Sequence, residues 1–256
     1  MTTASLEHDP LITEDDKSQA HLFSEKQQCL LANSLYHSWK GPGQGRSFVA
    51  LANVDLFDAP KKRPLIPDVL VSLDINMPDD VLRKSSHAYR IWEYGKPPEV
   101  VIQIVSTPEG KKYDTKLPDY AKIGVRYCVV FDPEKQLKRG LLRVYELRGT
   151  TYAEKNDRWL FGVELGITLW EGKYENNHNV WLRWCDRQGK LISTGTETTE
   201  EHRLEKEKAQ KQAEHERLEK EKALEWAEQE HQRAEQEHQR AERLAAQLRA
   251  LGIEPQ

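Results

Sequence analysis

Three polar residues lie in or beside segments that are typical of strands and helices, and together they could form a catalytic site. Asp68 opens the run DVLVSL, Gln103 interrupts the run EVVIQIV, and Lys116 lies in the helix-like stretch DTKLPDY. An acid at a strand start, a polar residue inside a nearby strand and a lysine on the adjoining helix can meet at one point. Oxygen ligands of this kind hold Mg²⁺ or Mn²⁺, and a lysine can orient or deprotonate water and offset charge on phosphorus. The set therefore indicates metal-dependent hydrolysis of a phosphodiester bond.

Each of these residues also has a plainer interpretation. The pair Pro67-Asp68 is typical of the start of a strand or turn. Gln103 stands between Ile102 and Ile104 and points away from both by strand alternation, so it would face water on an open sheet. A lysine on a short amphipathic helix is usually solvated. The chemistry therefore depends on whether the fold brings the three side chains together.

The elements that would position these residues follow from the spacing of the hydrophobic residues. Helical spacing predicts a helix from Ser24, as its N-cap, to Trp39, before a glycine-rich connector at 41–45. A second helix is predicted over 113–123 and ends at Gly124. Strands are predicted at 47–57, 68–73, 99–105 and 127–131, and a hairpin at 141–147 and 149–153. This order predicts an α/β (α+β) sandwich.

The sequence divides into four regions. Residues 1–20 are polar and acidic and are expected to be flexible. A globular domain is predicted over 21–192, with a β appendage from about residue 160 that includes a hairpin turning at Gln188-Gly189. Residues 193–201 are predicted to form a linker, and residues 202–252 a long charged helix.

The predicted C-terminal helix carries a seven-residue repeat. The heptad AEQEHQR occurs twice in succession, from Ala227 and from Ala234. This period is typical of a coiled coil, but a seam of alanine and histidine buries little apolar area. Two interpretations stay open: a weakly paired coiled coil, or a single solvated helix supported by its charge pairs.

Composition and charge exclude several classes of protein. The segment 197–249 holds 15 acidic and 11 basic residues, whereas the rest has 27 of each and is neutral. No apolar run approaches the ~18 residues of a membrane helix, and the N-terminus does not resemble a secretory signal. The cysteines form no disulfide or zinc pattern, and Cys128 within its apolar run is expected to be buried. We therefore expect a cytoplasmic protein with no membrane partner.

Several longer stretches carry a resemblance to a known family. They are IPDVLVSLD, IWEYGKPPEVVIQIVS, KLPDYAKIGVRYCVVFDP, LRVYELRG and GITLW, with SEKQQCLLANSLYHSW before them. In this order they resemble the putative restriction endonuclease family of the Uma-two type, in the PD-(D/E)xK nuclease superfamily. The ending AERLAAQLRALGIEP is similar to the cyanobacterial branch of that family. The resemblance implies a restriction-endonuclease-like core, in which helices flank a central mixed sheet, and Mg²⁺-dependent cleavage of DNA.

The resemblance also implies roles for individual residues. Asp68 corresponds to the metal-binding aspartate of the family, and Gln103 stands in the place of its metal-binding glutamate. Lys116 stands where the family has its lysine, on the helix after that strand. Glu25 falls where the superfamily often has an acid on its first helix. Asp68 and Gln103 would then hold Mg²⁺ or Mn²⁺ while Lys116 acts on the water.

Gln103 departs from the family pattern. An amide oxygen offers a dipole where a carboxylate offers a full charge, so weak metal binding is expected. Glu99, on the same face of the strand but roughly 13 Å away, is not expected to replace it. Pro118 is expected to fit only if its helix starts near Asp114.

Three hypotheses about function follow. The first is a metal-dependent DNA endonuclease. The alternative is a nuclease-fold protein that lost catalysis through Gln103 and binds DNA or protein. The third is an assembly protein that works through its tail. A homodimer would form through the core or the C-terminal helix. Because the globular part is neutral, DNA binding should be modest and salt-sensitive, through patches such as Lys61-Lys62-Arg63 and Lys111-Lys112.

Overall fold

The computed structural model describes residues 14–43, 45–75, 88–105 and 111–250. The chain divides into two compact units, Met1–Thr198 and Thr199–Gln256. All strands of the described residues lie in the first unit, and the second consists of the greater part of helix α4 (Gly195–Ala250).

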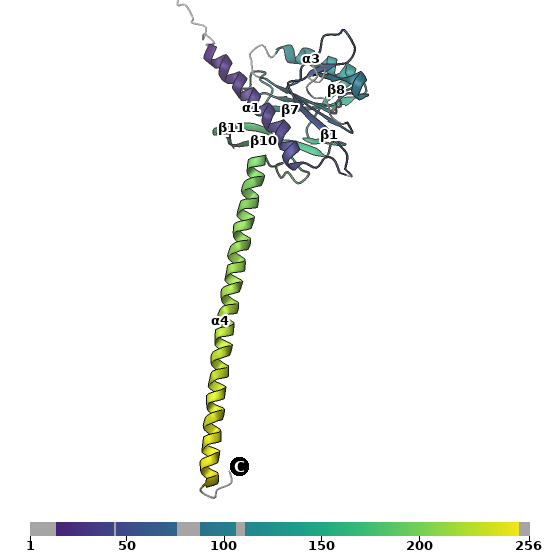
Figure 1. Cartoon of the computed structure of the whole chain (residues 1–256). Coiled ribbons are helices and arrows are strands. Elements are labelled where there is room, and N and C mark those ends of the chain that lie inside the picture. The colour runs from purple at the N-terminus through teal and green to yellow at the C-terminus, as the bar shows by residue number, and fades with distance from the viewer. Residues whose placement is uncertain (1–13, 44, 76–87, 106–110, 251–256) are drawn as a thin grey trace, which may run out of the picture. The chain divides into compact units, whose positions relative to one another are not determined.

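The first unit is built on a six-stranded sheet (Figure 1). Its strands stand in the order β1-β3-β5-β6-β7-β8. Their bounds are β1 Phe48–Ala52, β3 Val69–Leu73, β5 Val100–Ile104, β6 Tyr127–Phe131, β7 Leu142–Arg148 and β8 Thr151–Lys155. β5 and β6 are parallel and the other neighbouring pairs are antiparallel. This mixed sheet with its flanking helices confirms the predicted α+β fold.

Strand alternation gives the sheet two buried faces. All five residues of β5 are buried. Val100, Ile102 and Ile104 belong to one hydrophobic core and Val101 belongs to the other. Gln103 is on the same face as Val101, so a polar side chain points into the second core rather than into water.

Helix α1 (Glu14–Ser38) and a small second sheet cover the first face. This sheet consists of β9 (Trp159–Leu160), β10 (Leu165–Tyr174) and β11 (Asn177–Cys185). Gln27 of α1 joins helix and sheet, because its amide donates to Leu182 O at 2.8 Å and accepts from Leu182 N at 2.9 Å. The glutamine thereby satisfies both backbone groups of Leu182 on the outer edge of β11.

Helix α3 (Lys111–Ile123) and a pair of short strands cover the second face. β2 (Asp55–Phe57) and β4 (Ala88–Arg90) are parallel, and helix α2 (Ile91–Tyr94) follows β4 directly. Tyr120 of α3, Leu56 of β2 and Tyr89 of β4 belong to the core of this face, as does Cys128, whose burial was predicted. The segment predicted as one strand over 47–57 is therefore two strands in different sheets.

Helix α1 is longer than the hydrophobic spacing predicted. It begins at Glu14, so the segment 14–20, which was expected to be flexible, is helical. Ser24, the predicted N-cap, lies inside the helix and is buried. The packing of α1 on the first face, rather than a local cap, therefore positions this helix.

Helix α3 contains Pro118 and continues through it. The expectation that this proline requires a start near Asp114 is wrong, because the helix begins at Lys111. Proline removes one backbone hydrogen bond from the helix. Packing of Tyr120 and Leu117 against the second core supports the helix across this gap.

Helix α4 begins within the first unit on a reciprocal cap. Thr194 N donates to Glu197 Oε2 at 2.7 Å, and Glu197 N donates to Thr194 Oγ1 at 3.3 Å. The buried Arg183 donates to both carboxylate oxygens of Glu197 at 2.7 Å. The region predicted as a linker over 193–201 is thus helical from Gly195 onward.

The second unit is a solvated helix as far as it is described. Every side chain from Thr199 to Leu244 is exposed. Ion pairs such as Arg203 with Glu200 and Glu207 run along its surface. Such exposure is compatible with a helix that pairs in a coiled coil and with a single solvated helix, and both interpretations stay predictions. No described helix is both long and apolar enough to span a membrane.

Replacing Gln27 with alanine should lower the free energy of unfolding by about 2–3 kcal/mol, because both backbone groups of Leu182 lose their partner. Urea unfolding measures this change. Asn33→Ala is the control, since Asn33 is exposed on the same helix, and it should change stability by less than ~0.5 kcal/mol. Equal losses in the two variants would contradict the role given to Gln27.

Candidate active site

Asp68 lies at the entry to β3, where two neighbouring elements hold its carboxylate. Ile104 N donates to Oδ2 at 2.7 Å, and Gln28 Nε2 on α1 donates to Oδ1 at 2.9 Å. Asp68 N donates to Ile102 O at 3.0 Å. The backbone and the side chain of Asp68 are thus both bound to the end of β5, which fixes the carboxylate in place.

Burial raises the pKa of Asp68 above its ordinary value. The Ile104 amide, the Lys116 ammonium and the Gln28 amide each lower that pKa, but the effect of burial is larger. The ionised carboxylate therefore costs the folded state free energy. A cation bound beside it would offset this cost.

Gln103 is buried, with 6% of its surface exposed, beneath α3. Its Nε2 donates to Ile66 O and to Tyr120 Oη, each at 3.3 Å. Its Oε1 accepts a hydrogen bond from Lys116 Nζ at 3.0 Å. The interpretation in which Gln103 faces water is wrong, because α3 covers that face of the sheet. Both ends of the amide are engaged, as a buried amide requires.

Lys116 reaches the same point from α3. Its ammonium donates to Gln103 Oε1 and, at 3.3 Å, to Ile66 O. Its charge is also near enough to Asp68 to lower the pKa of that carboxyl. The structure thus brings Asp68, Gln103 and Lys116 together around the Ile66 carbonyl, which accepts hydrogen bonds from two of them.

Helix α1 contributes Gln28, which the sequence analysis did not identify. Glu25, the fourth predicted site residue, is exposed on α1, three residues before Gln28. Lys26 pairs with Glu175, and Gln27 binds β11. No spacing in the sequence distinguishes Gln28 from these polar neighbours, because its role depends on where α1 lies against the sheet.

The oxygen atoms at the site are of the type that binds a hard divalent cation, but they carry little negative charge. Carboxylate and amide oxygens, as in Asp68 and Gln103, are ligands that Mg²⁺ accepts. Within the described parts of the chain, no group of three or more His, Cys, Asp or Glu could hold a metal ion. Asp68 brings a single negative charge to the set, so any cation would be held weakly.

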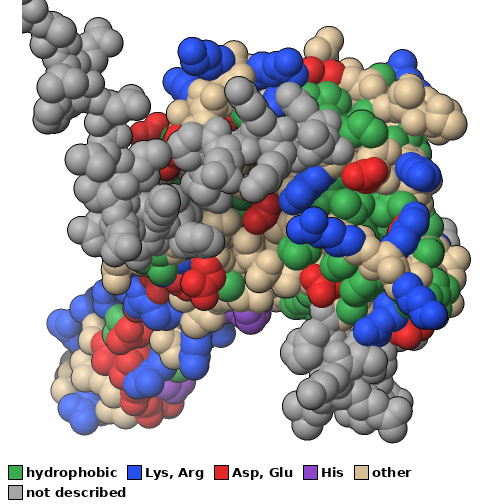
Figure 2. Space-filling model, turned by 90° about the horizontal axis from the view of Figure 1, so that it is seen from above, with side chains coloured by type: hydrophobic (Ala, Val, Ile, Leu, Met, Phe, Trp, Pro, Cys, Tyr) green, Lys and Arg blue, Asp and Glu red, His purple; other side chains and the backbone are tan. Residues whose placement is uncertain are grey.

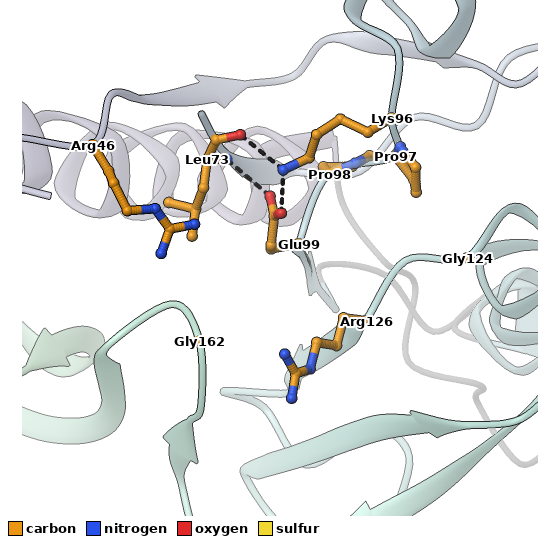
Figure 3. Close-up of a pocket in the computed structure, with 9 residues that line it drawn as sticks. All are labelled: Arg46, Leu73, Lys96, Pro97, Pro98, Glu99, Gly124, Arg126 and Gly162. Carbon is orange, nitrogen blue, oxygen red and sulfur yellow. Dashed lines mark hydrogen bonds and ion pairs between the residues drawn. The ribbon is translucent and has the colours of Figure 1, made fainter. Parts of the chain in front are cut away.

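The opposite end of the same strands carries a separate pocket of about 420 Å³ (Figure 3). Glu99, just before β5, lines it, and its carboxylate binds Lys96 and accepts from Leu73 N at 2.8 Å. Arg46 and Arg126 approach the same space from other loops (Figure 3). Glu99 is therefore engaged away from Gln103, in line with the expectation that it does not replace the missing carboxylate.

The side of the molecule on which α3 lies is seen from above in Figure 2. Lys and Arg side chains stand there together with Asp and Glu side chains and exposed hydrophobic ones.

Comparison with known families finds that Uma2, described as "Putative restriction endonuclease", matches residues 17–167. The match includes α1 from residue 17 onward, the six strands of the main sheet, and the residues Asp68, Gln103 and Lys116. A comparison with curated proteins finds no match.

Replacing Asp68 with asparagine should leave the protein at least as stable at pH 7. Because burial raises the pKa of Asp68, its ionised form destabilises the folded state above that pKa. The penalty disappears as the pH falls and the group is protonated in both states. An asparagine keeps an oxygen for the Ile104 amide.

Thermal unfolding of both proteins across the acid range measures this effect. The variant should melt at the same or a higher temperature at pH 7, and any advantage should shrink as the pH falls. A clear loss of stability at pH 7, or an advantage that grows in acid, would contradict the account.

Proposed function

The chain belongs to the Uma2 putative restriction endonuclease family, and we propose that it hydrolyses phosphodiester bonds of DNA with the help of Mg²⁺ or Mn²⁺. The single observation that carries this proposal is the meeting of Asp68, Gln103 and Lys116 at one end of β3 and β5. These residues are distant in the sequence, and a fold without a use for them could place them apart.

The three side chains share two roles between them. The Asp68 carboxylate and the Gln103 oxygen are the groups that would hold the ion, and Ile104 N and Gln28 keep Asp68 in position. A bound divalent cation would supply Lewis-acid polarisation of the phosphate and lower the pKa of a bound water. Lys116, held by Gln103 and the Ile66 carbonyl, orients the attacking water and offsets charge that develops on phosphorus.

One observation favours a second candidate function, in which the protein binds DNA without cutting it. Gln103 Nε2 donates to the carbonyl of Ile66. A glutamate at this position would set an oxygen against that carbonyl, so the contacts around residue 103 suit an amide in the absence of a metal. In this alternative, Gln103 and Lys116 preserve the shape of the site after its catalytic power is lost.

Purified protein with Mn²⁺ or Mg²⁺ should nick plasmid DNA and cleave single-stranded DNA slowly. Asp68→Asn should abolish this activity, and Lys116→Met should reduce it by roughly 100-fold or more, within the usual range for a residue that moves or positions a proton. Gel electrophoresis of timed reactions measures the rates, with EDTA as the metal-free control. Cleavage that persists in Asp68→Asn would exclude this site as its source.

Gln103→Glu should bind Mn²⁺ at least about 10-fold more tightly, or ~1.4 kcal/mol, because the site gains a second anionic ligand. Calorimetric titration of both proteins measures the affinity, and the cleavage assay follows the rate. An inert wild type beside an active glutamate variant would support the binding-only function. An active wild type that the substitution does not improve would remove Gln103 as the reason for weak activity.

A further inference from the structure

A platform of aromatic and basic side chains lies on the β2–β4 strand pair. We define it by Phe57, Lys61, Arg63, Arg90 and Trp92. Phe57 pairs with Arg90 in the strand register, and the two residues that follow Arg90 bring the chain to Trp92 on α2. These side chains have no part in the proposed catalysis.

Trp92 is held in place and is nevertheless open to solvent. It is 44% exposed, and its ring meets that of Phe57 edge-on, with centroids 6.5 Å apart and an interplanar angle of 66°. The guanidinium of Arg90 stands 6.0 Å from the centre of the Phe57 ring. The contact with Phe57 holds the tryptophan while a large part of the residue stays exposed, and an exposed aromatic ring is a surface on which a nucleic-acid base can stack.

Positive charge stands on the loop after β2. Lys61 and Arg63 are exposed, and neither has an ion pair or hydrogen bond to the parts of the chain that are described. The neighbouring Lys62 is paired with Asp58 at 2.5 Å. Arg90 of the platform is paired with Glu93 at 3.3 Å, so among the described residues of the platform the unpaired positive charge is that of Lys61 and Arg63 on the 61–63 loop. Exposed cations beside an aromatic face are typical of a surface that follows a phosphate backbone.

Backbone hydrogen bonds connect this platform to the candidate active site. Leu56 N donates to Leu65 O at 2.7 Å, and Leu65 N donates to Leu56 O at 2.9 Å. Leu65 is three residues before Asp68, or about 10 Å of extended chain. Between them, Ile66 exposes its side chain while its carbonyl holds Lys116. A strand whose phosphate lies at Asp68 would therefore need only a few nucleotides to reach the platform.

We propose that Trp92 stacks against an unpaired base, so that the protein engages single-stranded or locally unpaired DNA, while Lys61 and Arg63 bind the adjacent phosphates. In a duplex each base is already stacked between its neighbours. Such a base could stack on an exposed aromatic side chain only after it has left the duplex stack, which costs free energy. This inference rests on the proposed function for the class of its ligand, and it adds the form of DNA that is recognised.

The test measures binding in EDTA, so that no cleavage takes place. The full-length chain is titrated against a fluorescently labelled single strand of about 20 nucleotides and against the duplex of the same sequence, by anisotropy. Trp92→Ala should weaken single-strand binding by roughly 5- to 100-fold and leave duplex binding within ~2-fold, since stacking contributes that much per base. Trp92→Phe should restore most of the loss.

Matched controls separate stacking from charge and from damage to the fold. Trp226→Ala removes another exposed tryptophan, 66% exposed on α4, and should change neither affinity. Lys61→Ala and Arg63→Ala should weaken the binding of both single-stranded and duplex DNA, and should make that binding less dependent on salt. Thermal unfolding of Trp92→Ala and Trp92→Phe shows whether the fold is intact.

Three results would overturn the proposal. The first is an equal loss of single-strand and duplex binding in Trp92→Ala, and the second is unchanged single-strand affinity in a folded Trp92→Ala. The third is that the wild type binds neither form of DNA. Because binding is measured without metal, selective single-strand binding by a protein that never cleaves would uphold this inference while the catalytic proposal fails.

Discussion

A polar side chain in the middle of a fully buried strand is the constraint on which the candidate site depends. β5 is buried along its whole length, so Gln103 cannot reach water, and its amide must find partners inside the protein. Those partners are the Ile66 carbonyl, Tyr120 and Lys116, which come from the segment before β3 and from α3. Satisfying one glutamine therefore fixes the position of the lysine, the helix that carries it and the segment that leads to Asp68.

The same constraint bears on the electrostatics of the site. A glutamate at position 103, which the resemblance to the family predicts, would be buried near Asp68, and two like charges at such a place repel each other unless a cation is bound. With glutamine at 103, the side chain at this position is satisfied without an ion, because its amide donates to the Ile66 carbonyl and accepts from the lysine. Stability of the metal-free protein and affinity for metal are thus opposed at this residue.

The two faces of the main sheet serve different purposes. The α1 face is closed by α1 and by β9–β11, with Gln27 bound to the edge of β11. The α3 face carries Gln103 and Lys116, and the β2–β4 pair lies over the same core. The aromatic platform therefore lies on the α3 side of the sheet, whereas the site, at the end of β3 and β5, also takes Gln28 from α1 on the other side. The α4 helix begins on its own cap and adds a long solvated surface.

Sequence alone determined the strands of the main sheet, because short apolar runs bounded by turn residues have few other stable conformations. It also singled out Asp68 and Gln103, as polar residues beside or within apolar runs, whereas Lys116 stands in a polar stretch and was selected by its chemistry and by the resemblance to the family. It did not identify Gln28, the burial of Gln103, or the β2–β4 pair and α2, because each depends on which element packs against which face. Alternation along a strand gives the side of the sheet to which a residue points, but only the tertiary structure decides whether water or a helix lies on that side.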